Sequence, residues 1–126
     1  MEKINIVKEW LNFANKDINS AKYLLGMHPV PLEIICYHCE QAAEKALKAY
    51  LINRDIEPSR THDLRLLCKM CADFDESFNE ISKQCINLTA FGVQPRYPFE
   101  LQITDGDVET AIADADSILE FIFQRL

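Results

Sequence analysis

The sequence has little glycine and no long apolar run, and each shortage excludes a class of protein. Only 3 of the 126 residues are glycine, which is too few to build a Gly-rich loop that cradles phosphates. No stretch approaches the roughly 18 uninterrupted apolar residues that a membrane-spanning helix needs. The first ten residues carry four charges and no apolar run, unlike a secretory signal. We therefore expect a protein that makes no membrane contact.

The number of cysteines is odd, at five, so a complete disulfide framework is excluded. A reducing cytoplasmic compartment is the corresponding expectation. Cys36 and Cys39 form one pair with a zinc-like spacing, and Cys68 and Cys71 form a second. Both pairs fall on helical rows that they share with Leu and Ala, and 28 residues separate them. We interpret these cysteines as core residues and expect no metal and no cofactor.

Basic residues are scarce in the second half of the chain. Residues 1–70 carry 10 Lys and Arg against 9 Asp and Glu, whereas residues 71–126 carry 3 against 11. The net charge is −7. An acidic chain binds nucleic acid poorly without sequence preference, because phosphate contacts need clustered cations. Only the first half can hold a small basic patch.

What the sequence does contain is a helical period of apolar residues over most of its length. One row steps by three and four through Ile4, Val7, Leu11, Ala14, Ile18, Ala21 and Leu25. It predicts a helix over residues 4–27, ended by Gly26 and the His28-Pro29 pair. A second helix over residues 31–53 has a wide apolar face rich in alanine. Such a face is typical of a helix in the middle of a bundle.

Three further helices follow. A short one is predicted over residues 62–72 with Thr61 as its N-cap, and a fourth helix starts near Asp75. The period breaks over residues 91–103, and the last helix starts at Thr104 or Asp105. No segment alternates as a strand does. We predict an all-α fold, an up-and-down bundle of four principal helices plus one short helix, in a single domain over residues 1–126.

A polar row lies beside the apolar face of the second helix. His38, Gln41, Lys45 and Lys48 step by three, four and three. Glu44 precedes Lys48 by four residues, which is the favourable order for an ion pair. A solvated face with one salt bridge explains the row equally well. Because this helix is predicted to be central, however, we treat the row as a candidate ligand-binding site.

The loop before the last helix holds the other candidate. Arg96 and Tyr97 stand between Pro95 and Pro98, which favour an extended backbone. The arginine offers a planar fork for phosphate or carboxylate, and the tyrosine offers a stacking face. The alternative is a rigid connector in which Arg96 pairs with a local acid such as Glu100.

Four segments in register resemble the HEPN domain family (higher eukaryotes and prokaryotes nucleotide-binding). They are residues 37–51 (YHCEQAAEKALKAYL), the residues Trp10, Ala14, Asp17, Ile18 and Ala21 of the first helix, residues 60–64 (RTHDL) and residues 96–98 (RYP). The resemblance implies a helical bundle that usually dimerises. Many members are encoded beside a minimal nucleotidyltransferase, some as toxin–antitoxin pairs, and nucleotide binding is proposed for others. A large subset are metal-independent RNases, which carry an Arg, four to six residues and then a His.

This sequence departs from the RNase pattern. No His follows Arg96, seven residues separate Arg54 from His62, and Arg60 is only two positions before His62. The resemblance therefore implies a non-catalytic homodimeric accessory subunit for a minimal nucleotidyltransferase. A nucleotide or the partner would occupy a groove lined by His38, Gln41, Lys45, Lys48, Arg96 and Tyr97. The alternative is a toxin-like RNase that acts on RNA through His62 with Arg60 or Arg96. Phe91, Phe99 and Phe123 are candidates for the dimer surface.

Overall fold

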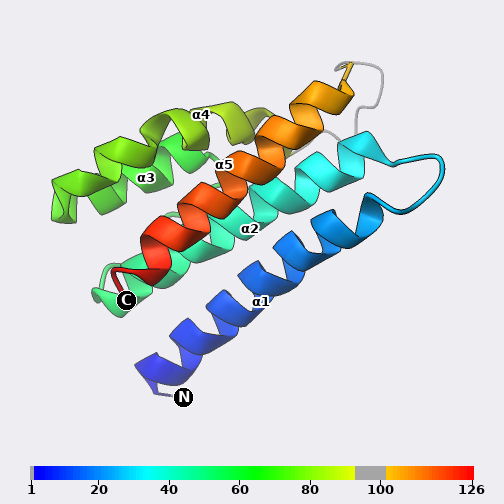
Figure 1. Ribbon diagram of the computed structural model, residues 1–126. Coiled ribbons are helices and arrows are strands. Elements are labelled where there is room, and N and C mark those ends of the chain that lie inside the picture. Colours follow the sequence, from blue (N-terminus) through cyan, green and yellow to red (C-terminus); the bar gives the residue numbers. More distant parts are fainter. Residues whose placement is uncertain (1, 93–101) are drawn as a thin grey trace.

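The protein is a bundle of helices (Figure 1). The structure, a computed structural model, describes residues 2–92 and 102–126. Over these residues it contains five α-helices, two short 3-10 helices and no strand. The elements are α1 (Lys3–Leu24), α2 (Leu32–Asn53), α3 (Leu64–Phe74), η1 (Glu76–Ile81), α4 (Ser82–Thr89), η2 (Ala90–Gly92) and α5 (Asp105–Phe123). The predicted all-α bundle is confirmed, and its fourth long segment consists of η1 followed by α4.

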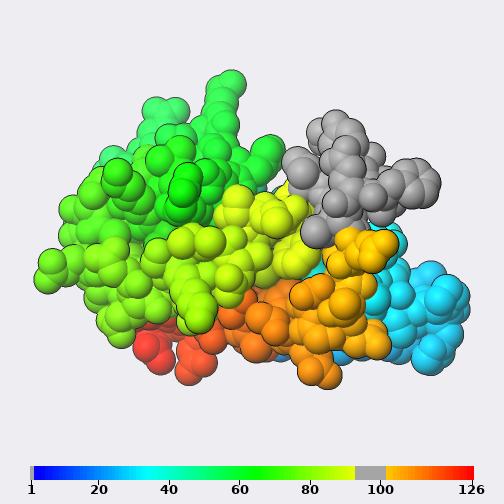
Figure 2. Space-filling view, turned by 90° about the horizontal axis from the view of Figure 1, so that it is seen from above, coloured from blue at the N-terminus to red at the C-terminus, as the bar shows by residue number. Residues whose placement is uncertain are grey.

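Helix α2 is the centre of the bundle. It contacts α1 on one side, α5 on another, and α3, α4 and η2 on the remaining side. Four of its alanines, Ala42, Ala43, Ala46 and Ala49, are completely buried. Their small side chains let the neighbouring helices approach closely, as the alanine-rich face predicted. Figure 2 shows the face that α3, α4 and α5 form, with the turn before α2 at the opposite end from α3.

Helix α1 ends at Leu24, three residues earlier than predicted. Its apolar row continues to Leu25, but both end members of that row, Ile4 and Leu25, are exposed. Residues 25–27 donate their backbone N–H groups to the carbonyls three residues before them, at 3.1–3.3 Å. These are the bonds of a tightened last turn, so the helix unwinds before Gly26.

The prediction that Thr61 caps α3 is wrong. Asp63 is the N-cap, and its carboxylate accepts the N–H of Arg65 at 3.0 Å. The Thr61 hydroxyl oxygen instead accepts the N–H of Asp63 at 3.1 Å. Either side chain can accept such a bond, and Asp63 lies nearer to the apolar row. His62 consequently precedes the helix instead of opening it.

The helical segment after Asp75 and helix α5 begin in different ways. The segment after Asp75 begins as 3-10 helix η1 and becomes α-helical only at Ser82. By contrast, α5 starts as predicted. The Thr104 hydroxyl accepts the N–H of Asp107 while the Asp107 carboxylate accepts the N–H of Thr104. This reciprocal capping box satisfies two backbone donors at once.

All five cysteines are free and buried, as expected of core residues. Burial raises the pKa of Cys36 and of Cys39 to about 12. Among the described residues no three His, Cys, Asp or Glu side chains are placed to hold a metal ion. In the same part of the chain no helix is both long and apolar enough to cross a bilayer.

Candidate functional site

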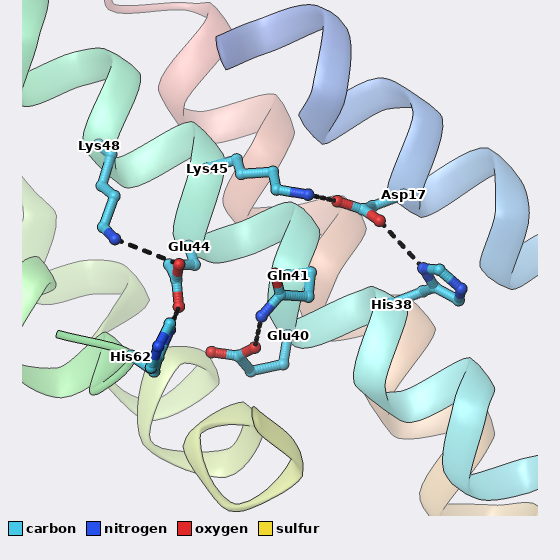
Figure 3. A network of polar contacts seen from close by, with 8 residues as sticks. All are labelled: Asp17, His38, Glu40, Gln41, Glu44, Lys45, Lys48 and His62. Carbon is cyan, nitrogen blue, oxygen red and sulfur yellow. Dashed lines mark hydrogen bonds and ion pairs between the residues drawn. The ribbon is translucent and has the colours of Figure 1, made fainter. Parts of the chain in front are cut away.

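One face of α2 carries a network of charged and polar side chains (Figure 3). We call it the polar strip, and it consists of His38, Glu40, Gln41, Glu44, Lys45 and Lys48 of α2. Asp17 of α1 contacts one end of the strip, and His62, from the segment before α3, contacts the other. The four residues predicted as a polar row do share this face. Each of the two lysines in the strip, however, has a carboxylate partner.

At the α1 side of the strip, Asp17 binds two α2 side chains. One carboxylate oxygen lies 3.0 Å from Nδ1 of His38, and the other forms an ion pair with Nζ of Lys45. All three side chains are largely or partly buried. Sequence reasoning missed the role of Asp17, although an acid between Ala14 and Ile18, next to an apolar row, was a signal of a buried partner.

At the α3 side of the strip, Glu44 also binds two side chains. Its Oε2 lies 3.2 Å from Nζ of Lys48, which confirms the predicted ion pair, and its Oε1 lies 2.8 Å from Nδ1 of His62. The Glu44 and Lys48 side chains are 6% and 11% exposed, but that of His62 is 72% exposed. A buried carboxylate therefore holds one nitrogen of an imidazole whose ring reaches solvent.

Glu40, which the sequence analysis did not single out, is the most deeply buried charged residue of the strip. Its side chain is completely buried, and Oε2 accepts a hydrogen bond from Nε2 of Gln41 at 2.8 Å. Within the described residues Oε1 has no hydrogen-bond partner. Burial, and then the charge of Glu44, raises the pKa of Glu40 to about 8. At neutral pH this carboxyl is mostly protonated and can donate a hydrogen bond.

The backbone of η2 packs directly against Glu40. A Cβ atom at Gly92 would lie 3.2 to 3.4 Å from the three carboxyl atoms of Glu40, which is closer than an ordinary van der Waals contact. Glycine at this position lets η2 cover the carboxyl group and exclude water from it. This contact explains why a carboxyl on the surface of α2 becomes buried.

Two aromatic side chains of α1 lie beside the lysines of the strip. Nζ of Lys48 is 5.9 Å from the centre of the Trp10 ring, and Nζ of Lys45 is 5.8 Å from that of Phe13. Both distances allow a cation–π attraction. Each lysine thus has a carboxylate and a ring as neighbours.

The remaining candidate residues are Arg60, Arg96 and Tyr97. Arg96 and Tyr97 lie outside the described residues, as does Phe99. Arg60 is exposed, in the segment between α2 and α3. Because Asp17 and Glu44 neutralise Lys45 and Lys48, an anion at the strip would have to compete with both carboxylates. The His62 ring, in contrast, is largely exposed and open to a molecule from solvent.

Comparison with known proteins agrees with the all-α bundle and with the resemblance to the HEPN domain. A family model described as the HEPN domain matches residues 7–126. A protein of Methanocaldococcus jannaschii named as a candidate toxin, MJ1304, is 28% identical over 94% of this chain and 87% of its own length. The crystal structure of TT1696 from Thermus thermophilus superposes with a TM-score of 0.80 at 25% identity and covers 95% of this chain and 98% of that one. The crystal structure of ST0689, an archaeal HEPN homologue, superposes with a TM-score of 0.74 at 24% identity and covers 94% of this chain and 96% of that one.

Proposed function

This chain belongs to the HEPN domain family, and from that membership we propose that it is a homodimeric binding module without catalytic activity of its own. It serves as an accessory subunit of a minimal nucleotidyltransferase in the cytoplasm. The resemblance to family members that are encoded beside such enzymes is the reason for this choice of partner.

The observation that carries the proposal is the charge pairing of the polar strip. Lys45 is bound by Asp17 and Lys48 by Glu44. A catalytic cation would have to stabilise charge that develops on a reacting phosphate. The positive charge of a lysine that is already paired with a buried carboxylate is largely neutralised, so it stabilises such a phosphate weakly. The strip therefore fits a structural and recognition role better than a catalytic one.

Nucleotide binding is the more demanding part of the proposal. A phosphate would approach Lys45 and His38 at the edge of the strip, and Arg96 would supply an additional guanidinium. Tyr97 would stack on the base. Binding of this kind must displace or share the Asp17 carboxylate, so we expect modest affinity.

Two measurements test the proposal. Co-expression with a minimal nucleotidyltransferase from the same genome should give a complex that elutes as one species. Calorimetric titration with ATP and GTP should give binding heat that is lost in Lys45→Ala and in Arg96→Ala. Lys69→Ala, which removes an exposed lysine of α3, is the control. A chain that elutes alone and gives no heat with either nucleotide would remove both parts of the proposal.

A second function, an RNase of the toxin type, is favoured by one specific contact. Glu44 orients His62 through Nδ1, as a carboxylate orients a general base in many enzymes. The other ring nitrogen could accept the proton of an attacking ribose hydroxyl, and exposed Arg60 is two residues away. The name of the M. jannaschii relative points in the same direction.

The RNase alternative predicts cleavage of RNA in the presence of EDTA. The activity should disappear in His62→Ala and persist in His28→Ala, which removes an exposed histidine of the turn between α1 and α2. RNA that stays intact with the unaltered protein rules out this alternative and leaves the binding module as the remaining function.

A further inference from the structure

A hollow lies on the surface where α1 and α2 meet, beside the end of the polar strip that Asp17 contacts. We call it the α1/α2 hollow. Its volume is about 640 Å³, which is within the usual range of small-molecule sites. The α1 residues of its lining follow a helical spacing of three and four, so they share one side of α1, and one residue of α2 faces them. The lining consists of Lys16, Asn19, Ser20, Tyr23, Leu24 and His38.

The lining of the α1/α2 hollow contains no carboxylate, although the chain has 20 Asp and Glu. Four other hollows of the described residues each contain at least one. Asp116 and Glu120 lie between α1 and α5, Asp63 lines two hollows near the start of α3, and Asp107 and Asp114 lie between α4 and α5. In an acidic chain, an anion is repelled least where no carboxylate faces it.

Lys16 gives the hollow one positive charge. The residue is exposed, and in the part of the chain that the structure describes it forms no ion pair. Lys22, Lys45 and Lys48, by contrast, each have a carboxylate partner. Nζ of Lys16 lies 5.3 Å from the centre of the Phe13 ring, and a ring attracts an ammonium group without cancelling its charge. The charge of Lys16 is therefore available to an anion from solvent.

The other polar groups of the hollow can donate hydrogen bonds to the same anion. Nδ1 of His38 is held by Asp17 at 3.0 Å, and Figure 3 shows the second ring nitrogen, Nε2, pointing away from that carboxylate. Nε2 is a donor when the ring is protonated. Asn19 and Ser20 add an amide and a hydroxyl donor from α1.

An aromatic ring and an aliphatic side chain form the apolar part of the hollow. The Tyr23 side chain is 86% exposed, and Leu24 is partly buried against the core. A planar ring bound between them would stack on Tyr23 and cover apolar surface that now faces water. Lys16, a single cation, matches one negative charge and not the several charges of a nucleoside triphosphate.

We propose that the α1/α2 hollow binds a small aromatic monocarboxylate, with the carboxylate on Lys16 and the ring against Tyr23 and Leu24. This site goes beyond the proposed function, in which a nucleotide approaches Lys45 of the polar strip. Of the lining of the hollow, only His38 belongs to that strip.

NMR titration of the full chain with benzoate tests the proposal. Benzoate should shift the backbone amide signals of residues 16–24 and of His38. Benzamide, which has the same ring without the charge, should bind about tenfold more weakly, because hydrogen bonds to a charged acceptor are the stronger ones. Acetate, which has the charge without the ring, should also bind about tenfold more weakly.

Two variants assign the charge and the ring to their residues. Lys16→Met should weaken benzoate binding by about tenfold and leave benzamide binding as it was. Lys8→Met removes another exposed lysine of α1, outside the hollow, and should have no effect. Tyr23→Ser should weaken the binding of benzoate but not that of acetate. Both substituted residues are exposed, so the variants should fold.

Three results would overturn the proposal. Benzoate that leaves the signals of residues 16–24 unchanged at every soluble concentration means that the hollow is not a site for such acids. Equal affinity for benzoate and benzamide, or an equal loss in Lys16→Met and Lys8→Met, means that Lys16 does not select an anion. Equal affinity for benzoate and acetate means that the ring is not recognised.

Discussion

Nδ1 of His62 lies 2.8 Å from Oε1 of Glu44, so a largely exposed imidazole is attached to a nearly buried carboxylate. The same carboxylate neutralises Lys48, which is itself almost buried. Glu44 therefore links the segment before α3 to the centre of the bundle. Two partners of different burial, Lys48 and His62, therefore depend on this one side chain.

Removing Glu44 should destabilise the protein strongly. Glu44→Ala leaves Lys48 buried without a counter-charge, which typically costs about 3–5 kcal/mol of unfolding free energy. Lys48→Met should cost less, because His62 still partners Glu44, and Lys48→Met should rescue part of the loss when added to Glu44→Ala. Urea unfolding of the three variants measures these differences. A cost below about 1 kcal/mol for Glu44→Ala would contradict the contact described here.

The free energy of unfolding should decrease as the pH rises, because the pKa of Glu40 is raised in the folded chain. Its pKa rises from an ordinary 4.5 to about 8 in the folded chain, so the folded state keeps a proton that the unfolded state loses. Between these two values the free energy of unfolding should decrease with rising pH, by up to about 1.4 kcal/mol per unit. Above about pH 8 both states are ionised and the contribution of Glu40 becomes constant.

Glu40→Gln isolates this effect, since glutamine resembles the neutral acid and cannot ionise. Relative to the unaltered protein the variant should gain stability steadily from about pH 5 to about pH 8. Glu120→Gln, at an exposed position of α5, is the control and should follow the unaltered protein. Parallel curves for Glu40→Gln and the unaltered protein would mean that Glu40 is ionised at neutral pH.

Gly92→Ala should destabilise the protein by roughly 1–3 kcal/mol, because the added methyl group would come within 3.2 Å of the buried Glu40 carboxyl, which would have to shift. Gly106→Ala is the matched control. A Cβ there meets only the Thr104 hydroxyl, at 3.7 Å, and Ala in the first turn of α5 favours the helix by up to about 1 kcal/mol. Thermal unfolding compares the two, and equal midpoints would refute the tight contact.

Asp17→Asn should increase anion binding. The variant removes the charge that neutralises Lys45 and holds His38, so a phosphate meets less competition, and we expect roughly tenfold tighter nucleotide binding. Asp116→Asn frees Lys22 instead, outside the polar strip, and should leave nucleotide affinity as it was. Calorimetry with ATP measures both. The same affinity in both variants would exclude the strip as the nucleotide site.

The sequence is sufficient to predict features that depend on local spacing. The alanine-rich face of α2, the start of α5 at Thr104 and the pairing of Glu44 with Lys48 all follow from residues within one or two turns. The choice of cap for α3 is less certain from spacing alone, because Thr61 and Asp63 can each accept the required bond.

Contacts between distant segments could not be predicted in this way. Asp17 meets Lys45 across 28 positions of sequence, and Gly92 meets Glu40 from η2. Each contact depends on how far one helix is rotated about its own axis against another, and the apolar period sets that rotation only within the width of its stripe. The burial of Glu40 depends on the packing of η2 and does not follow from the spacing of residues along α2.

The position of Trp10 gives the protein a spectroscopic label of its own. The chain has a single tryptophan. Its ring lies beside Nζ of Lys48, and that same Nζ pairs with the Glu44 carboxylate. Indole emission responds to nearby charge, so the fluorescence of the unmodified chain reports on one place in the molecule. A nucleotide, a nucleotidyltransferase or a change in pH that rearranges this corner can be followed directly, without attaching a dye.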